Sequence, residues 1–211
     1  MYLSSFRLGD HPERLLALVG LPGSAAVIAN AMDGAPEETR ADAVQRELVA
    51  LRGLGLEAEE VDLRGYFDEP ARLAGDLARY QLVWLRGGNV FMLRYALAAS
   101  GADAVITDLV RRDALIYGGY SAGPCVLAPS LRGLEICDDP SLVLATYGVP
   151  AIWEGMGLLP YAIVPHYESP AHPETTLCGM VAERYRAEAV PHRTLRDGQS
   201  LVIDRGTTAI W

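Results

Sequence analysis

Short apolar segments alternate with longer segments of helical periodicity along the first two-thirds of the chain. The predicted strands cover residues 25–30, 56–63, 81–86 and 114–120. The predicted helices cover residues 37–54, 73–78, 91–99 and 102–112. Because each apolar strand is followed by a helix, the strands are expected to run parallel and to be buried on both sides. The pattern therefore predicts an α/β fold with an open, mainly parallel sheet and helices on both faces.

The last third of the chain has a different order of elements. A strand is predicted at 161–165 and a helix at 174–189. Residues 200–204 and 207–211 are expected to form a C-terminal β-hairpin, in which Gly206 suits a turn with positive φ. No repeat or linker-like segment divides the sequence, so residues 1–211 are expected to form a single α/β domain.

Composition narrows the classes of function. With 211 residues, half of them hydrophobic, the chain can bury a full core. The net charge of −9, with no cluster of basic residues, argues against nucleic-acid binding, which requires concentrated positive charge. All 18 basic residues are arginine, so no lysine is available for a Schiff base, a Ser-Lys dyad or a Walker phosphate site.

The sequence also suggests where the protein works. The N-terminal residues lack the pattern of a signal peptide, and no apolar run reaches the roughly 18 residues that span a bilayer. The three cysteines are odd in number and lack metal-site spacing, which is typical of free thiols in a reducing compartment. We therefore expect a cytoplasmic protein without membrane contact.

The motif G-Y-S-A-G at 119–123 follows the last of the parallel strands. A serine in a tight strand-to-helix turn exposes its hydroxyl at the end of the sheet, and the crowded turn requires small neighbours two residues away on each side. An ordinary βα turn would carry the same glycines, but the position after an apolar strand favours a nucleophile. Ser121 is therefore the predicted nucleophile.

A second glycine-rich turn, Gly87-Gly88-Asn89, follows the strand at 81–86. In α/β hydrolases, the amide after the nucleophile and an amide from a neighbouring strand-end loop together form the oxyanion hole. Here those amides would belong to Ala122 and Gly88. Judged alone, the turn is equally consistent with a purely structural role.

His166 ends the apolar run A-I-V-P-H, which places it at the carboxyl end of a strand, where open α/β sheets bind ligands. It is the predicted general base. The cluster His166-Tyr167-Glu168 with His172-Pro173-Glu174 could also be interpreted as a metal site. Its spacing matches no common zinc motif, and prolines interrupt any helix that would align the ligands, so no metal site is predicted.

Four segments resemble the peptidase E (aspartyl dipeptidase) family of serine peptidases, which is related to cyanophycinase. They are R-G-G-N-V-F-M-L (86–93), I-Y-G-G-Y-S-A-G (116–123), A-P-S-L-R (128–132) and I-V-P-H-Y (163–167). The resemblance implies a flavodoxin-like fold similar to that of class I glutamine amidotransferases. It also implies a Ser-His-acid triad.

In this resemblance Ser121 matches the nucleophile and His166 the histidine of the triad. Glu135 falls at the position where the family commonly has its acid, about fourteen residues after the serine, which implies a Ser-His-Glu triad. Asp138 and Asp139 are close enough in the sequence to take that role instead. Glu135 is expected in a short strand between two apolar neighbours, with its side chain turned towards His166.

The residues predict acyl transfer without metal or cofactor, and the resemblance implies small peptides as substrates, with dipeptides carrying N-terminal aspartate among the candidates. Asn89 and Arg132 are the candidate substrate-binding residues. Another acyl hydrolase, such as an esterase or amidase, and a non-catalytic binding protein on the same fold remain alternatives. Glutamine amidotransfer is disfavoured because the turn carries serine, with Cys125 four residues later. The sequence leaves open whether the protein forms a homodimer.

Overall fold

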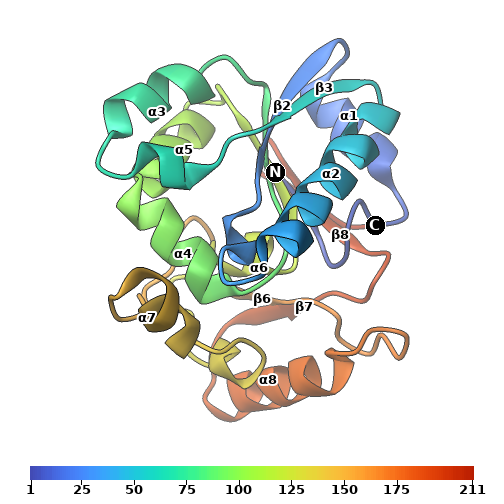
Figure 1. The fold of residues 1–211 in the computed structure, drawn as a ribbon. Helices are drawn as coiled ribbons and strands as arrows, with labels where there is room; N and C mark the ends of the chain where they lie inside the picture. Colours follow the sequence, from blue (N-terminus) through green and yellow to red (C-terminus); the bar gives the residue numbers. More distant parts are fainter.

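Seven strands form one sheet in the order β3-β2-β4-β5-β1-β8-β9 (Figure 1). The computed structural model describes residues 1–211. The strands are β1 (Tyr2–Ser4), β2 (Gly23–Ile28), β3 (Leu56–Glu60), β4 (Leu82–Leu85), β5 (Ile116–Tyr120), β8 (Ser200–Asp204) and β9 (Thr207–Ile210). The first five pair in parallel, whereas β8 and β9 form an antiparallel hairpin next to β1. The predicted mainly parallel sheet with a C-terminal hairpin is confirmed.

Helices cover both faces of this sheet (Figure 1). They are α1 (Pro12–Val19), α2 (Glu37–Gly53), α3 (Pro70–Leu77), α4 (Val90–Ala99) and α5 (Ala102–Arg111). Strand β4 contributes side chains to two hydrophobic clusters, one on each face of the sheet. Leu82 and Trp84 pack with the buried residues of α1 and α2, whereas Val83 and Leu85 pack with those of α3, α4 and α5. Successive side chains of a strand point to opposite faces, so a continuous apolar run is needed to fill both layers.

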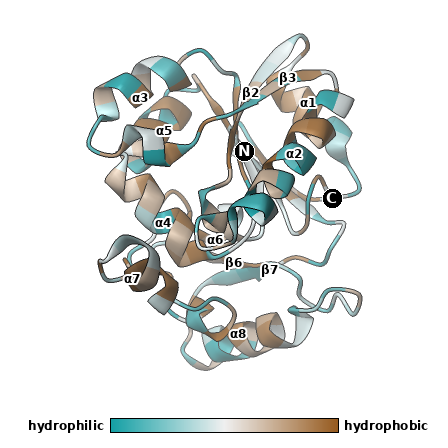
Figure 2. Cartoon of the chain, in the orientation of Figure 1, coloured by the Kyte–Doolittle hydropathy of each residue, from teal (hydrophilic) through white to brown (hydrophobic).

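The helices have the polarity expected of covering elements. Figure 2 shows hydrophilic and hydrophobic residues alternating along α2 and α8, and the buried positions of α2 recur at helical spacing: 40, 43, 44, 47, 48 and 51. No single helix combines the length and hydropathy needed to cross a membrane, and α4 and α5 reach these values only together, across an 87° bend. Most of α4 is buried in the larger core, which accounts for its apolar sequence.

The chain between β5 and β8 forms a second layer beside the carboxyl ends of the parallel strands (Figure 1). Its elements are α6 (Ala122–Cys125), α7 (Ser141–Tyr147), β6 (Ala162–Val164), α8 (Thr175–Ala187) and β7 (His192–Thr194). Strands β6 and β7 pair in parallel as a separate two-stranded sheet. The strand predicted at 161–165 and the helix predicted at 174–189 are present, whereas β1, β7, α1 and α7 were not predicted.

Candidate active site

Ser121 lies between β5 and α6 with a strained backbone. Its φ of 53° and ψ of −111° fall in a region that residues with a side chain rarely adopt. The sharp turn is the geometry of a nucleophile elbow, which holds the hydroxyl clear of the sheet at the end of a strand. Strain of this kind persists only where the surrounding structure enforces it, and it is concentrated at functional sites.

The two motif glycines are required by the carbonyl of Leu85 on the neighbouring strand. A Cβ atom at Gly119 would lie 2.5 Å from the Leu85 oxygen, and one at Gly123 would lie 2.6 Å from the same atom. Both distances are shorter than real Cβ contacts, and the obstacle is backbone that cannot move aside. The sequence requirement for small residues at these positions therefore has a direct steric cause.

His166 is buried just after β6, with its ring held by an acid from the loop after β7. The His166 Nδ1 atom lies 2.7 Å from Oδ1 of Asp197. Asp197 acts as the acceptor, so the ring carries its proton on Nδ1 and leaves Nε2 free to accept one. Burial lowers the pKa of His166 below its ordinary value of 6.5, although the hydrogen bond to Asp197 opposes the shift. A neutral imidazole with a free Nε2 is the form that a general base requires.

Two serines fix this pair in place. The Ser5 hydroxyl lies 2.8 Å from the Asp197 carboxylate and also accepts the backbone N–H of His166 at 2.8 Å. The backbone N–H of Asp197 donates to the Ser169 hydroxyl at 2.8 Å. Ser5 is fully buried and directly follows β1. It therefore links the end of the main sheet to the loops that carry His166 and Asp197.

The prediction that Glu135 contacts His166 is wrong. Residues 134–136 form a 3₁₀ turn rather than a strand, after Gly133 with a φ of 102°. The Glu135 carboxylate instead accepts hydrogen bonds from Arg184 at 2.7 Å and from its own turn, at the Gly133 N–H. These contacts lower the pKa of Glu135 against the opposing effect of partial burial, and they tie the turn to α8.

The neighbouring acids do not reach His166 either, and only one of them approaches the serine. Asp139 is bound to the backbone N–H of Ser141 at the start of α7. Asp138 accepts the N–H of Val90 at 2.9 Å and lines a small pocket beside Ser121. Burial raises the pKa of Asp138 to about 7, and the nearby Glu174 adds to the rise.

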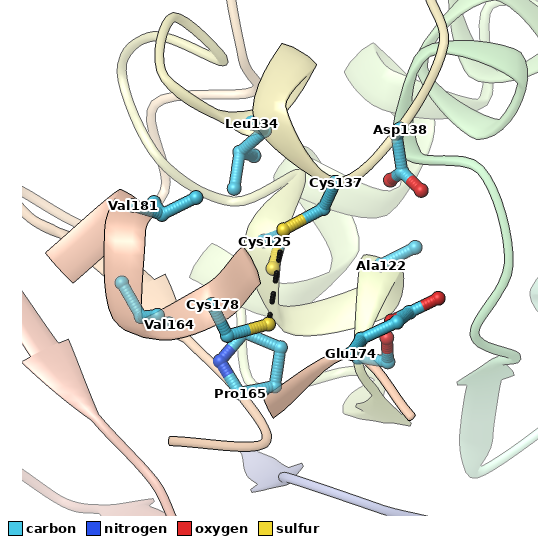
Figure 3. Close-up of a pocket in the computed structure, with 11 residues that line it drawn as sticks. Ala122, Cys125, Leu134, Cys137, Asp138, Val164, Pro165, Glu174, Cys178 and Val181 are labelled. Carbon is cyan, nitrogen blue, oxygen red and sulfur yellow. Dashed lines mark hydrogen bonds between the residues drawn. The ribbon is translucent and has the colours of Figure 1, made fainter. Parts of the chain in front are cut away.

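This small pocket is shown in Figure 3. Its volume of about 20 Å³ holds little more than one water-sized group. Asp138 and Glu174 are the acids that line it, none of its eleven lining residues is cationic, and the thiols of Cys137 and Cys178 lie 3.8 Å apart in its wall. Glu174 and Ser121 also line a larger neighbouring cavity, so both residues border the two spaces.

The larger cavity, of about 190 Å³, brings the predicted site residues together. Ser121, His166 and Gly88 all line it, although no hydrogen bond joins the serine to the histidine. The amides of Gly88 and Ala122 donate no hydrogen bond within the protein. Gly88 has a φ of 145°, and a Cβ atom there would lie 2.7 Å from the Ala31 oxygen, which explains the glycine. Two free amides near a serine hydroxyl are the components of an oxyanion hole.

His172 lies flat against His166 in the same cavity. The ring centroids are 3.6 Å apart and the planes differ by 1°, while Phe6 meets both rings edge-on. Nitrogen and oxygen atoms of His166, His172 and Glu174 lie within 4.8 Å of one another, a distance that a metal ion could bridge. The lone pairs of parallel rings run side by side rather than converge, however, so this arrangement is poorly suited to tetrahedral coordination.

The two candidate substrate-binding residues lie elsewhere. Asn89 is the N-cap of α4, where its side chain accepts hydrogen bonds from the Phe91 and Met92 amides and donates one to the Asp139 carbonyl. Arg132 stacks over Trp153 and borders a different cavity, and it does not line either space beside Ser121. The arginine in the cavity of Ser121 and His166 is Arg86.

Sequence reasoning missed Asp197 and Arg86. Asp197-Gly198 has the composition of an ordinary turn, and only the pairing of β6 with β7 carries it to the histidine. Arg86 immediately precedes the glycine turn, at a strand end that was already singled out. Its position at the carboxyl edge of the sheet was the signal that could have identified it.

The model of peptidase family S51 matches residues 34–211. Peptidase E of Streptomyces coelicolor is 33% identical over 151 residues, which cover 68% of this chain and 57% of that protein. An uncharacterized peptidase of Listeria monocytogenes is 26% identical over 127 residues, which cover 60% of this chain and 58% of that protein. The matched part thus spans just over half the length of these curated relatives.

Solved structures show the same fold. A putative peptidase E protein from Listeria monocytogenes superimposes with a TM-score of 0.80 at 19% identity, covering 100% of this chain and 96% of that chain. A peptidase from an acI-B1 actinobacterium gives a TM-score of 0.70 at 15% identity, covering 100% of this chain and 86% of that chain. The family match extends over most of the sequence and includes the serine turn and both residues of the His166–Asp197 pair. The chain belongs to peptidase family S51.

Proposed function

We propose that the protein is a serine peptidase that cleaves small peptides with a Ser121-His166-Asp197 triad. The observation that supports this most directly is the hydrogen bond of 2.7 Å between His166 and Asp197, in a cavity that Ser121 also lines. The chain order is serine, histidine, acid, which differs from the order serine, acid, histidine expected from the sequence. Triads are defined by geometry rather than by order, so the change does not affect the chemistry.

The proposed reaction begins when His166 Nε2 takes the Ser121 proton as the hydroxyl oxygen attacks the scissile carbonyl. The same nitrogen then gives that proton to the leaving amine, and a water molecule releases the acyl group in a second attack. The serine and histidine make no hydrogen bond in the structure. We expect rotation of the Ser121 side chain to close this contact when substrate enters, since such contacts tighten in the complex.

The Gly88 and Ala122 amides would hold the carbonyl oxygen as it becomes negative. Both donors are free, and Ala122 begins a helix. Removing one donor of an oxyanion hole costs about 3 kcal/mol of transition-state stabilisation in comparable enzymes. The proposal needs no metal or organic cofactor.

We extend the proposal to dipeptides as the preferred size of substrate. The acids of the small pocket, Asp138 and Glu174, suit the α-ammonium group of a free N-terminus, which lies one carbon from the scissile carbonyl. N-terminal aspartate is one candidate residue, because Arg86 in the cavity could pair with its side chain. An esterase or amidase acting through the same serine is the second candidate function.

The proposal is tested by labelling the protein with a fluorophosphonate and by assaying Asp-Xaa, Glu-Xaa and neutral dipeptides beside a simple ester. Wild type should be labelled at Ser121 and should cleave at least one dipeptide, while Ser121→Ala should do neither. Labelling together with hydrolysis of the ester alone would favour the second candidate function. A Ser121→Ala variant with wild-type turnover would refute the serine mechanism.

A further inference from the structure

A second cavity, of about 100 Å³, adjoins the one that contains Ser121 and His166. The two cavities share Phe6, Arg86 and Tyr120 in their walls. Arg7 and Arg46 complete the cationic lining of the second cavity, so three arginines surround it. Glu47 is the one acid among its eight lining residues.

This acid is already bound by other groups. One Glu47 oxygen accepts the Trp84 indole N–H at 2.9 Å, and the other accepts the Tyr120 hydroxyl at 2.8 Å. The latter oxygen lies 3.6 Å from the Nε atom of Arg86, too far for a normal hydrogen bond. Glu47 thus ties α2 to β4 and β5, and it offsets only part of the positive charge.

The arginines have unused hydrogen-bonding capacity. The Arg86 side chain is 13% exposed, and its Nε atom is buried without a hydrogen-bond partner. A buried donor left unpaired costs free energy, so such a group usually indicates a missing ligand or water. Arg7 stacks on Phe6, and neither Arg7 nor Arg46 forms an ion pair with any acid of the chain.

We propose that Arg86, with Arg7 and Arg46, binds a carboxylate of the substrate, namely the free C-terminal carboxylate of the leaving residue. A guanidinium group matches a carboxylate in shape and charge and can donate two parallel hydrogen bonds to it. Two anionic groups of a peptide could compete for the site: the C-terminal carboxylate and the side chain of an acidic residue.

The position of the site favours the C-terminus. The leaving amine departs on the side of the base that protonates it, which is His166. Phe6 packs edge-on against His166 and also lines the arginine cavity, so this cavity lies next to the leaving-group side. Of the two acids that suit the N-terminal ammonium, Asp138 lines only the small pocket beside Ser121, and Glu174 lies where that pocket meets the larger cavity. A substrate held at both charged ends is short, and the site therefore selects dipeptides.

This inference rests on the proposed function, but binding tests it without turnover. In the Ser121→Ala background, calorimetry would compare Ala-Ala, Ala-Ala amide and Asp-Ala amide. Ala-Ala should bind about tenfold more tightly than Ala-Ala amide, the ratio expected when one ion pair is lost. Adding Arg46→Gln should reduce this ratio towards one, and adding Arg86→Gln should do the same if that variant folds. Arg111→Gln, an exposed arginine on α5 outside both cavities, is the matched control for the change of charge and should leave the ratio intact.

Equal affinities for Ala-Ala and its amide would overturn the proposal. It would also be overturned if Arg46→Gln weakened Asp-Ala amide but not Ala-Ala, because the site would then take a side-chain carboxylate. Fluorophosphonate labelling of the wild-type protein tests the serine mechanism independently of these binding measurements. A protein that binds Ala-Ala as expected but is not labelled would refute the serine mechanism while keeping the carboxylate site.

Discussion

The imidazole of His166 and the carboxylate of Asp197 are joined by a hydrogen bond of 2.7 Å across 31 positions of sequence. Each follows a strand of the small parallel pair, and Ser5 contacts both from the end of β1. Because Asp197 accepts the Nδ1 proton, the ring is held in the tautomer whose Nε2 faces away from the acid. Loops of the second layer therefore fix the orientation of the His166 ring in a cavity that Ser121 also lines.

Asp197→Asn should reduce kcat by about 10²–10⁴, because an amide in place of the carboxylate no longer selects this tautomer or stabilises the charged ring. Steady-state assays on the preferred dipeptide would measure the loss. Glu135→Gln is the control, since Glu135 pairs with Arg184, and it should retain most activity. A severe loss in the Glu135 variant with an active Asp197 variant would reverse the assignment.

Gly123→Ala should disrupt the elbow, because the added Cβ atom would lie 2.6 Å from the Leu85 oxygen. We expect a loss of about 1–3 kcal/mol in the free energy of unfolding, together with strongly reduced activity, as β4 and β5 move apart. Gly75→Ala on α3 has open space and should be neutral or stabilising by about 0.5–1 kcal/mol. Denaturant unfolding compares the two variants, and an unperturbed Gly123→Ala protein would contradict the steric account.

His172 should control the ionisation and the orientation of His166 through the stack of the two rings. Proximity of a second imidazole contributes to the lowered pKa of His166, so His172→Phe should move the acid limb of the kcat/KM profile to higher pH. The phenyl ring keeps the planar contact, and most of kcat should survive. His172→Ala removes the contact as well and should lower kcat further. An unchanged acid limb in both variants would show that the stack has no influence on the base.

Asp138 should make the protein less stable at alkaline pH. Its pKa is raised from 3.8 to about 7 in the folded state, so the folded protein binds the extra proton between these values and stability falls as pH rises through them. Asp138→Asn removes the cost of the buried charge and can still accept the Val90 N–H. Its Tm relative to wild type should therefore be higher at pH 8 than at pH 5, by about 2–4 °C for each kcal/mol. Asp139→Asn is the exposed control, and an equal Tm difference at both pH values would refute the ionisation.

The sequence by itself predicted the parallel strands β2, β3, β4 and β5, and it singled out Ser121 and His166, which the structure brings to one cavity. Apolar runs such as 81–86 must be buried on both faces of a sheet, and the segments between them have helical spacing. Together these two patterns are compatible with few folds other than a parallel sheet covered by helices. The turn around Ser121 was predictable because the Leu85 backbone approaches it so closely that only glycine fits at positions 119 and 123. His166 followed from its place at the end of an apolar run.

Only the tertiary structure decided which acid serves the histidine and which arginine faces the cavity. Glu135 and Asp197 are both acids in short connecting segments, and local pattern does not distinguish them. Their roles depend on long-range pairing: the strand order brings the loop after β7 to His166, whereas the Glu135 turn packs against Arg184 of α8. Backbone pairing between distant strands determines which loops come into contact. The residues around an acid in a loop therefore do not indicate which side chain it will contact in the folded protein.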